Sequence, residues 1–172
     1  MANEGAASVD RERGFTLLEG AAYRFEEPDL LFTVLRGVQP YETVDALCIA
    51  TARWAASKPY YLSLTDLREA GTPTPAARKR GTEALRAARL HGTAFIGGSP
   101  TVRAISAMIF RAIALLSARA REAPVRFFAT EPEARAWLAE RRAQIQQSAA
   151  SGTGEGGARP TARALGERSS TR

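Results

Sequence analysis

The fold is decided by the stretch Gly92-Thr93-Ala94-Phe95-Ile96-Gly97-Gly98-Ser99-Pro100, which runs directly into the apolar segment Thr101–Arg119. Ala94–Ile96 shows no polar alternation, which is typical of a strand covered on both faces. Ser99 is a natural N-cap, and Pro100 suits the first helical position, where its missing N–H costs nothing. Residues 92–119 therefore predict a buried strand, a tight turn and a capped helix.

The helix after this turn carries the strongest apolar pattern in the chain, with a spacing of about 3.6 residues. Burying each of these side chains is worth roughly 1–3 kcal/mol, which outweighs any single surface feature. We therefore expect the whole stripe to pack into the core. The stripe consists of Val102, Ile105, Ile109, Ala112, Ile113 and Leu116.

Outward from this unit, strand and helix patterns alternate. This order, β-β-α-β-α-β-α-β-α, predicts an α/β fold with a mixed sheet, about four helices, and helices on both faces. Phe15–Gly20 reads as an edge strand or a lead-in to the sheet. The other expected strands are 22–27, 30–36, 60–67, 94–96 and 125–129, and the expected helices are 41–57, 76–91, 100–119 and 131–146, the last with Thr130 and Glu133 placed for a capping box.

The two ends of the chain have a different composition from the middle. Residues 1–14 are small and charged without periodicity, which predicts a flexible terminus. From residue 148 the sequence is rich in Ser, Gly and Ala and offers little to bury, so 148–172 is expected to be a disordered basic tail. The predicted domain is therefore 15–147.

The formal charge of +6 is unevenly distributed. Residues 1–75 hold 7 basic and 11 acidic side chains, whereas residues 76–148 hold 13 and 5. A basic side attracts an acidic protein, an anionic membrane surface or nucleic acid, although a solvated arginine-rich face explains the same counts. Nucleic-acid binding is not expected, because aromatic residues are not interleaved with the arginines of the basic helix and no helix-turn-helix pattern occurs.

The chain has one cysteine, Cys48, and one histidine, His91. These counts exclude an internal disulfide and leave no Ser-His-Asp, Cys-His or zinc pattern to argue for. We therefore expect no enzyme activity, no metal and no cofactor. We expect Cys48 to be a small core residue and His91 to cap the carboxyl end of its helix. No signal pattern and no apolar run of about 18 residues occurs, which makes a cytoplasmic protein without a transmembrane segment the expectation.

Three segments together resemble one family. They are the strand end Leu64-Thr65-Asp66-Leu67, the turn Phe95–Arg103, and Pro124–Leu138, which contains Glu133-Ala134-Arg135-Ala136-Trp137-Leu138. The last is similar to the carboxyl-terminal strand and Glu-x-Ala-x-x-Trp-Leu helix of bacterial STAS-like proteins, the fold of anti-sigma-factor antagonists. The broader group includes CRAL-TRIO lipid-binding domains. The resemblance covers roughly residues 20–142.

The resemblance implies a non-catalytic regulatory module for protein–protein interaction, of a kind that acts in bacterial signalling. Its alternative is a small-ligand or lipid-binding domain of CRAL-TRIO type. The expected partner is another protein, with an acidic surface as one candidate; peripheral membrane contact and self-association remain open. Some family members are switched by phosphorylation in an Asp-Ser-Ser/Thr-Gly-like loop, and that motif is absent from 66–75 here.

Two candidate sites follow from the residues. A switch loop would use a phosphorylatable threonine at a helix N-terminus near three basic side chains, although a threonine that only caps the helix fits equally. A glycine turn would offer backbone N–H groups to an anion, although a turn that lets strand and helix pack closely explains the same glycines. The first site comprises Asp66, Thr72, Thr74, Arg78, Lys79 and Arg80, and the second Gly97, Gly98, Ser99 and Arg103.

Overall fold

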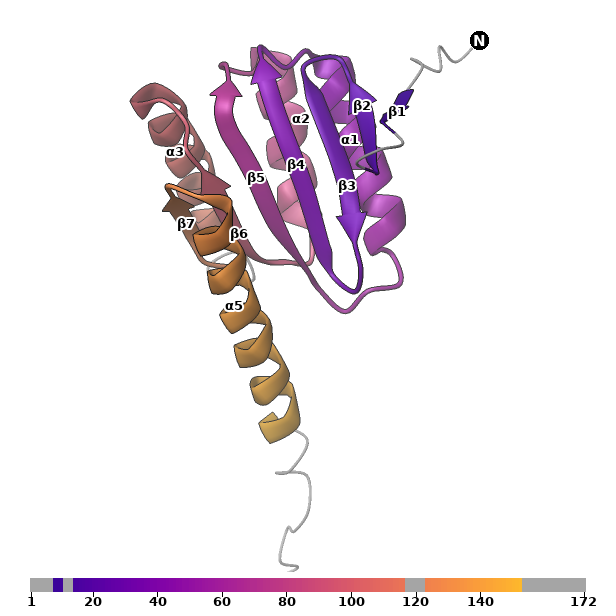
Figure 1. Cartoon of the computed structure of the whole chain (residues 1–172), viewed down its shortest axis with the longest axis vertical. Coiled ribbons are helices and arrows are strands. Elements are labelled where there is room, and N and C mark those ends of the chain that lie inside the picture. The colour runs from indigo at the N-terminus through magenta and orange to yellow at the C-terminus, as the bar shows by residue number, and fades with distance from the viewer. Residues whose placement is uncertain (1–7, 11–13, 117–122, 153–172) are drawn as a thin grey trace, which may run out of the picture.

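The computed structural model describes residues 8–10, 14–116 and 123–152. These residues form a mixed α/β fold built on one seven-stranded sheet (Figure 1). The strands are β1 (Ser8–Asp10), β2 (Phe15–Leu18), β3 (Ala21–Glu26), β4 (Leu30–Gly37), β5 (Tyr61–Ala70), β6 (Leu90–Ile96) and β7 (Val125–Phe128). The described helices are α1 (Tyr41–Ala55), α2 (Pro75–Ala87), α3 (Pro100–Leu116) and α5 (Glu131–Gly152).

The strands follow one another across the sheet in chain order, β1-β2-β3-β4-β5-β6-β7. β1 to β4 pair antiparallel, and β4 to β7 pair parallel. Parallel crossovers are right-handed, so three successive crossovers in one direction place α1, α2 and α3 on the same face. α5 follows the last strand and covers the opposite face (Figure 1). We call these the three-helix face and the α5 face.

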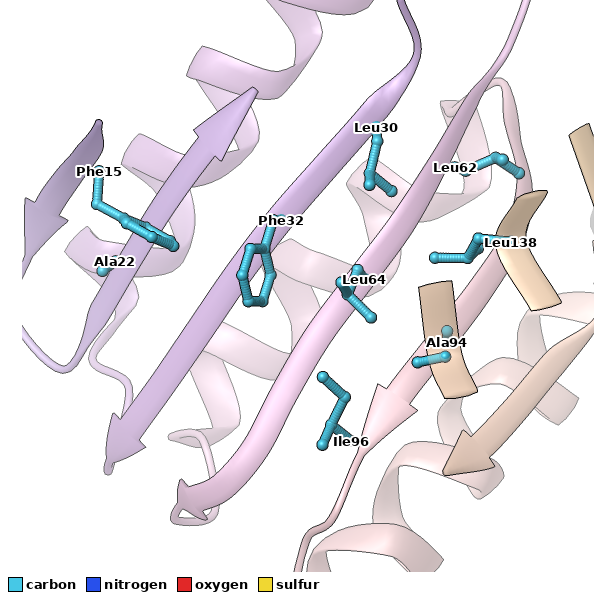
Figure 2. Close-up of a cluster of buried hydrophobic side chains, with 10 residues drawn as sticks. Phe15, Ala22, Leu30, Phe32, Leu62, Leu64, Ala94, Ile96 and Leu138 are labelled. Carbon is cyan, nitrogen blue, oxygen red and sulfur yellow. The ribbon is translucent and has the colours of Figure 1, made fainter. Parts of the chain in front are cut away.

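The core is divided between the two faces because strand side chains alternate. On the α5 face, Phe32, Leu64 and Ala94 lie side by side in register and pack with Leu138 of α5 (Figure 2). On the three-helix face, Tyr61 packs with side chains of α1 and α2, and a second cluster surrounds Phe95. The predicted helices on both faces are therefore confirmed.

The local signals around the central turn are confirmed as well. α3 begins at Pro100, and the Ser99 hydroxyl accepts a hydrogen bond from the Val102 N–H at 3.3 Å. At the start of α5, the Thr130 hydroxyl accepts from the Glu133 N–H and the Glu133 carboxylate accepts from the Thr130 N–H. These caps need only neighbouring residues, which is why the sequence predicts them well.

The structure corrects the end of the second predicted helix. α2 ends at Ala87, and β6 begins at Leu90, so His91 lies in a strand and not at a helix end. Its ring packs against Tyr60 at 5.5 Å. The reason is tertiary: Leu90 is paired with Tyr61 of β5, and this pairing extends the strand before Gly92.

The predicted limits of the domain also change. Ser8–Asp10, placed in the flexible terminus, form β1 and pair with β2. α5 continues to Gly152, beyond the predicted limit of residue 147. β5 runs on to Ala70, so Asp66 lies inside this strand and not at its end. Residues 1–7, 11–13 and 153–172 lie outside the described residues.

The expectation that the whole apolar stripe of α3 is buried is wrong. Val102 and Ile113 are buried, Ile105 and Ile109 are half-buried, and Ala112 is exposed. The Leu116 side chain lies outside the described part. The half-buried residues Ile105 and Ile109 border an open space beneath α3.

Candidate functional site

An apolar cavity of about 200 Å³ lies on the three-helix face, between α1, α2, α3 and the sheet. Its floor consists of Leu35 of β4, Leu67 of β5 and Phe95 of β6. Each strand contributes every second residue to one face, so three neighbouring parallel strands line the floor with side chains from the three-helix face. The cavity therefore sits near the carboxyl ends of these strands, where α/β proteins bind ligands.

The walls explain why this space is unfilled. α2 presents Ala77 and Gly81 to it, one helical turn apart, and these residues supply almost no side-chain volume. A Cβ at Gly81 would lie 3.6 Å from Val44 Cγ1 of α1, an ordinary van der Waals distance, so the glycine leaves space there that a side chain would fill. On the other side α3 contributes Ile105 and Ile109. A small-sided helix beside a bulky one leaves a gap that neither of them fills.

The mouth of the cavity is held by backbone contacts. Gly71 lines it, and a Cβ on Gly71 would lie 2.7 Å from the Gly37 carbonyl oxygen, so a side chain does not fit there. The Gly71 N–H donates to that same oxygen. The amide of Gln39, which is buried, donates to it as well at 2.6 Å. This network ties the loop before α2 to the end of β4.

The predicted switch loop reaches the cavity in part. Thr72 and Arg78 line it. The Thr74 hydroxyl accepts a hydrogen bond from the Ala77 N–H at 3.3 Å and so caps α2. Lys79 is exposed on α2.

Two other members of the predicted switch loop have ion-pair partners elsewhere. The Arg80 guanidinium pairs with the Asp45 carboxylate of α1 at 2.6 Å. Asp66 is buried, and both of its oxygens accept hydrogen bonds from the Arg68 side chain. Burial raises the pKa of the Asp66 carboxyl, but the hydrogen bonds from Arg68 outweigh burial and leave that pKa below its ordinary value. The predicted residues thus do not form one cluster.

The glycine turn after β6 is packed with side chains. Gly97 and Gly98 have φ of 64° and 86°, a conformation that other residues rarely adopt. A Cβ on Gly97 would lie 2.5 Å from Arg68 Cγ, and one on Gly98 would lie 3.2 Å from Leu67 Cβ. Arg103 stacks its guanidinium over the Phe127 ring at 5.0 Å. The glycines therefore allow close approach of the neighbouring strand.

Sequence reasoning missed most of the cavity residues, among them Phe95, Ile105 and Ile109, which it assigned to the core. The available signal was the small-sided stripe of α2 that begins at Ala77. Its low side-chain volume, set against the bulky stripe of α3, indicates an unfilled space. The depth of that space depends on the spacing between helices, which periodicity does not give.

Titratable groups add little to the chemistry near the cavity. The Cys48 thiol is half-buried on α1, and burial raises its pKa, which opposes thiolate formation. The described residues contain no group of three or more His, Cys, Asp or Glu side chains placed to hold a metal ion. Within the same residues, no helix is long and apolar enough to cross a membrane.

Comparison with known proteins identifies the fold. No family model matches the sequence, and no curated protein matches it. The structure is similar to the crystal structure of an uncharacterized protein of the DUF3478 family from Shewanella loihica, which has a SpoIIAA-like fold. The TM-score is 0.53 at 17% sequence identity, covering 69% of this chain and 94% of that chain. The chain therefore has a SpoIIAA-like, STAS-type fold.

Proposed function

We propose that this chain is a non-catalytic STAS-type module that binds a small apolar ligand in the cavity between α2 and α3. The cavity itself carries the proposal. A cavity of about 150 Å³ lined by Leu, Ile and Phe binds benzene, and the space here is about 200 Å³ with a similar lining. A single aromatic ring with a short alkyl group, or a short branched chain, is a ligand of suitable size.

The polar groups at the rim support binding over catalysis. The Gln39 amide donates to backbone carbonyls, and the Thr82 hydroxyl donates to the Arg78 carbonyl at 2.8 Å. A general base needs a free acceptor within hydrogen-bond reach of a substrate proton. These groups instead hold the loop and the helix that shape the cavity. The ligand-binding expectation attached to the CRAL-TRIO resemblance is therefore favoured over a reaction.

Filling the cavity from α3 is expected to weaken ligand binding. Ser106 lines the cavity, so Ser106→Leu places a larger apolar side chain in the ligand's space. We expect the affinity for ethylbenzene, measured by NMR titration, to fall by about tenfold or more, while filling the void raises stability by about 0.5–2 kcal/mol.

Met108→Leu is the matched control, because Met108 lies on the outer side of the same helix and is 59% exposed. This variant should bind ethylbenzene as the unmodified chain does. If the unmodified chain gives no saturable binding, or if Ser106→Leu binds equally well, the proposed function is wrong.

A second candidate function is the regulatory interaction with another protein. Met108 and Leu115 of α3 are 59% and 82% exposed, and the exposed Arg111 lies between them. Apolar side chains at this helical spacing with an intervening cation suit a partner surface that is apolar and acidic.

This candidate is tested by replacing both apolar side chains with serine. Met108→Ser combined with Leu115→Ser should lose a partner that the tagged, unmodified chain retains in stoichiometric amount. Ile49→Ser is the control, since Ile49 is exposed to 41% on α1. Loss of the same partner from the Ile49 variant, or retention by the double variant, excludes the outer side of α3 as the interaction surface.

A further inference from the structure

One buried hydroxyl in the sheet lacks a partner. Thr93 of β6 is 2% exposed, and its Oγ1 makes no hydrogen bond within the described part of the chain. An unsatisfied buried polar group costs about 1–3 kcal/mol, so such groups usually have a reason. Valine has nearly the same shape and would avoid this cost. The hydroxyl is therefore available to a hydrogen-bond partner that the described residues do not supply.

Thr93 belongs to a layer of hydroxyl groups on the three-helix face. Thr33 is paired in register with Thr65, and Ser63 with Thr93. All four are buried, with exposures between 2% and 8%. Ser63 Oγ and Thr65 Oγ1 are 3.4 Å apart and share one long hydrogen bond. The layer thus offers neutral donors and acceptors, and it contains no charged side chain.

A second, smaller cavity of about 20 Å³ lies next to the first. Leu90 of β6 and Ile113 of α3 line it. Leu85 of α2 and Phe110 of α3 line both cavities, so these two side chains form the partition between them. The Phe110 ring is half-buried and meets Phe95 edge to face at 5.7 Å.

On β6, Thr93 lies between two residues that line the two cavities. Leu90, Thr93 and Phe95 all face the three helices, Leu90 lines the small cavity, and Phe95 lines the large one. Thr93 therefore lies on β6 between the floors of the two cavities. The Phe110 ring, which lines both cavities, therefore lies over the part of β6 that contains Thr93.

We infer that the ligand of the proposed binding function is an uncharged molecule with an apolar body and one hydroxyl or carbonyl group, and that Thr93 hydrogen-bonds that polar group after Phe110 moves aside. This inference rests on the proposed function and specifies its ligand class. Moving a charged head group from water to a floor of neutral hydroxyls costs free energy, because the neutral groups do not replace the hydration of the charge. Arg86 borders the small cavity and is exposed, so a carboxylate is the alternative that the experiment must separate.

The test compares three ligands of one shape: ethylbenzene, 4-ethylphenol and 4-ethylbenzoate. Their affinities are measured by calorimetry for the unmodified chain, for Thr93→Val and for Thr16→Val. Thr93→Val keeps the shape and removes the hydroxyl. Thr16→Val makes the same change on β2 at a residue that lines neither cavity, and it is the matched control. The melting temperature of each variant shows that it is folded.

We expect the ratio of 4-ethylphenol to ethylbenzene affinity to fall about fivefold in Thr93→Val, as for the loss of one hydrogen bond, and to stay unchanged in Thr16→Val. On addition of 4-ethylphenol, the Leu90 methyl signals of the unmodified chain should shift, because Leu90 lines the small cavity and not the large one.

Three results would overturn the inference while the proposed function stands. In the first, ethylbenzene binds but Thr93→Val leaves the ratio unchanged, so that the hydroxyl has another partner such as a buried water. In the second, the ratio falls equally in Thr16→Val. In the third, 4-ethylbenzoate binds more tightly than 4-ethylphenol. If none of the three ligands binds the unmodified chain, the proposed function fails and the inference fails with it.

Discussion

Leu64→Ala is expected to lower the free energy of unfolding by about 3–4 kcal/mol. Leu64 is fully buried on the central strand β5, where Phe32 and Ala94 flank it in register. Leu138 of α5 belongs to the same cluster (Figure 2). Truncation removes buried methyl groups and leaves a hole between the sheet and α5. Because strands on both sides and a helix above are fixed, the site cannot collapse to fill that hole.

Urea unfolding followed by circular dichroism measures this change, and the slope with denaturant should stay constant. Leu115→Ala is the control, because Leu115 is 82% exposed, and its effect should stay within about 0.5 kcal/mol. A loss below about 1 kcal/mol for Leu64→Ala would mean that α5 does not cover the sheet as described.

Asp29→Ala is expected to cost about 3 kcal/mol of stability. Asp29 lies in the turn between β3 and β4, its side chain is 7% exposed, and both of its oxygens accept from the Arg142 guanidinium of α5. The pair joins residues 113 positions apart in the chain. Removing the carboxylate leaves a partly buried cation without its counter-charge, which costs more than the pair itself contributes.

A double variant separates the cost of an unpaired Arg142 charge from the stability that the ion pair itself contributes. Asp29→Ala combined with Arg142→Met removes both charges, so the double variant should recover much of the stability lost by Asp29→Ala alone. Glu69→Ala is the control, because it breaks an exposed ion pair with Arg36 and should cost no more than about 1 kcal/mol. Equal losses for the single and double variants would show that the charge of Arg142 needs no partner.

These two tests probe contacts that differ in how far the sequence predicts them. The strand around Leu64 is apparent from its apolar residues. The contact of Asp29 with Arg142 is not, because nothing local links a turn residue to a helix more than a hundred positions away. The same contrast applies to the functional site. Thr74 is recognisable as a cap from its place before α2, whereas the space between Ala77 and Ile109 depends on how far α3 stands from the sheet.

The predicted anion turn and switch loop show the limit of local reasoning. Gly97 and Gly98 are recognisable as a turn from the sequence. The side chains that fill the space beside this turn, Leu67 and Arg68, come from a neighbouring strand, so local sequence does not reveal them. The chemistry of Thr72 and Arg78 predicts a switch, but both border the cavity. Thr72 does so because backbone hydrogen bonds tie the loop before α2 to the end of β4, and Arg78 does so from α2. Their roles as switch residues stay predictions.

The chain between Gly92 and Leu116 shows which features the sequence determines by itself and which ones the tertiary structure decides. Hydrophobic periodicity and capping are interactions among neighbours, so the amino-acid order alone specified the buried strand, the glycine turn and a helix beginning at Pro100. The start of β6 depends on its pairing with β5. The distance of α3 from the sheet and the position of Thr93 relative to the cavities depend on how helices pack against the sheet. Those distances arise from packing among distant segments, and the candidate ligand site exists because that packing leaves a gap.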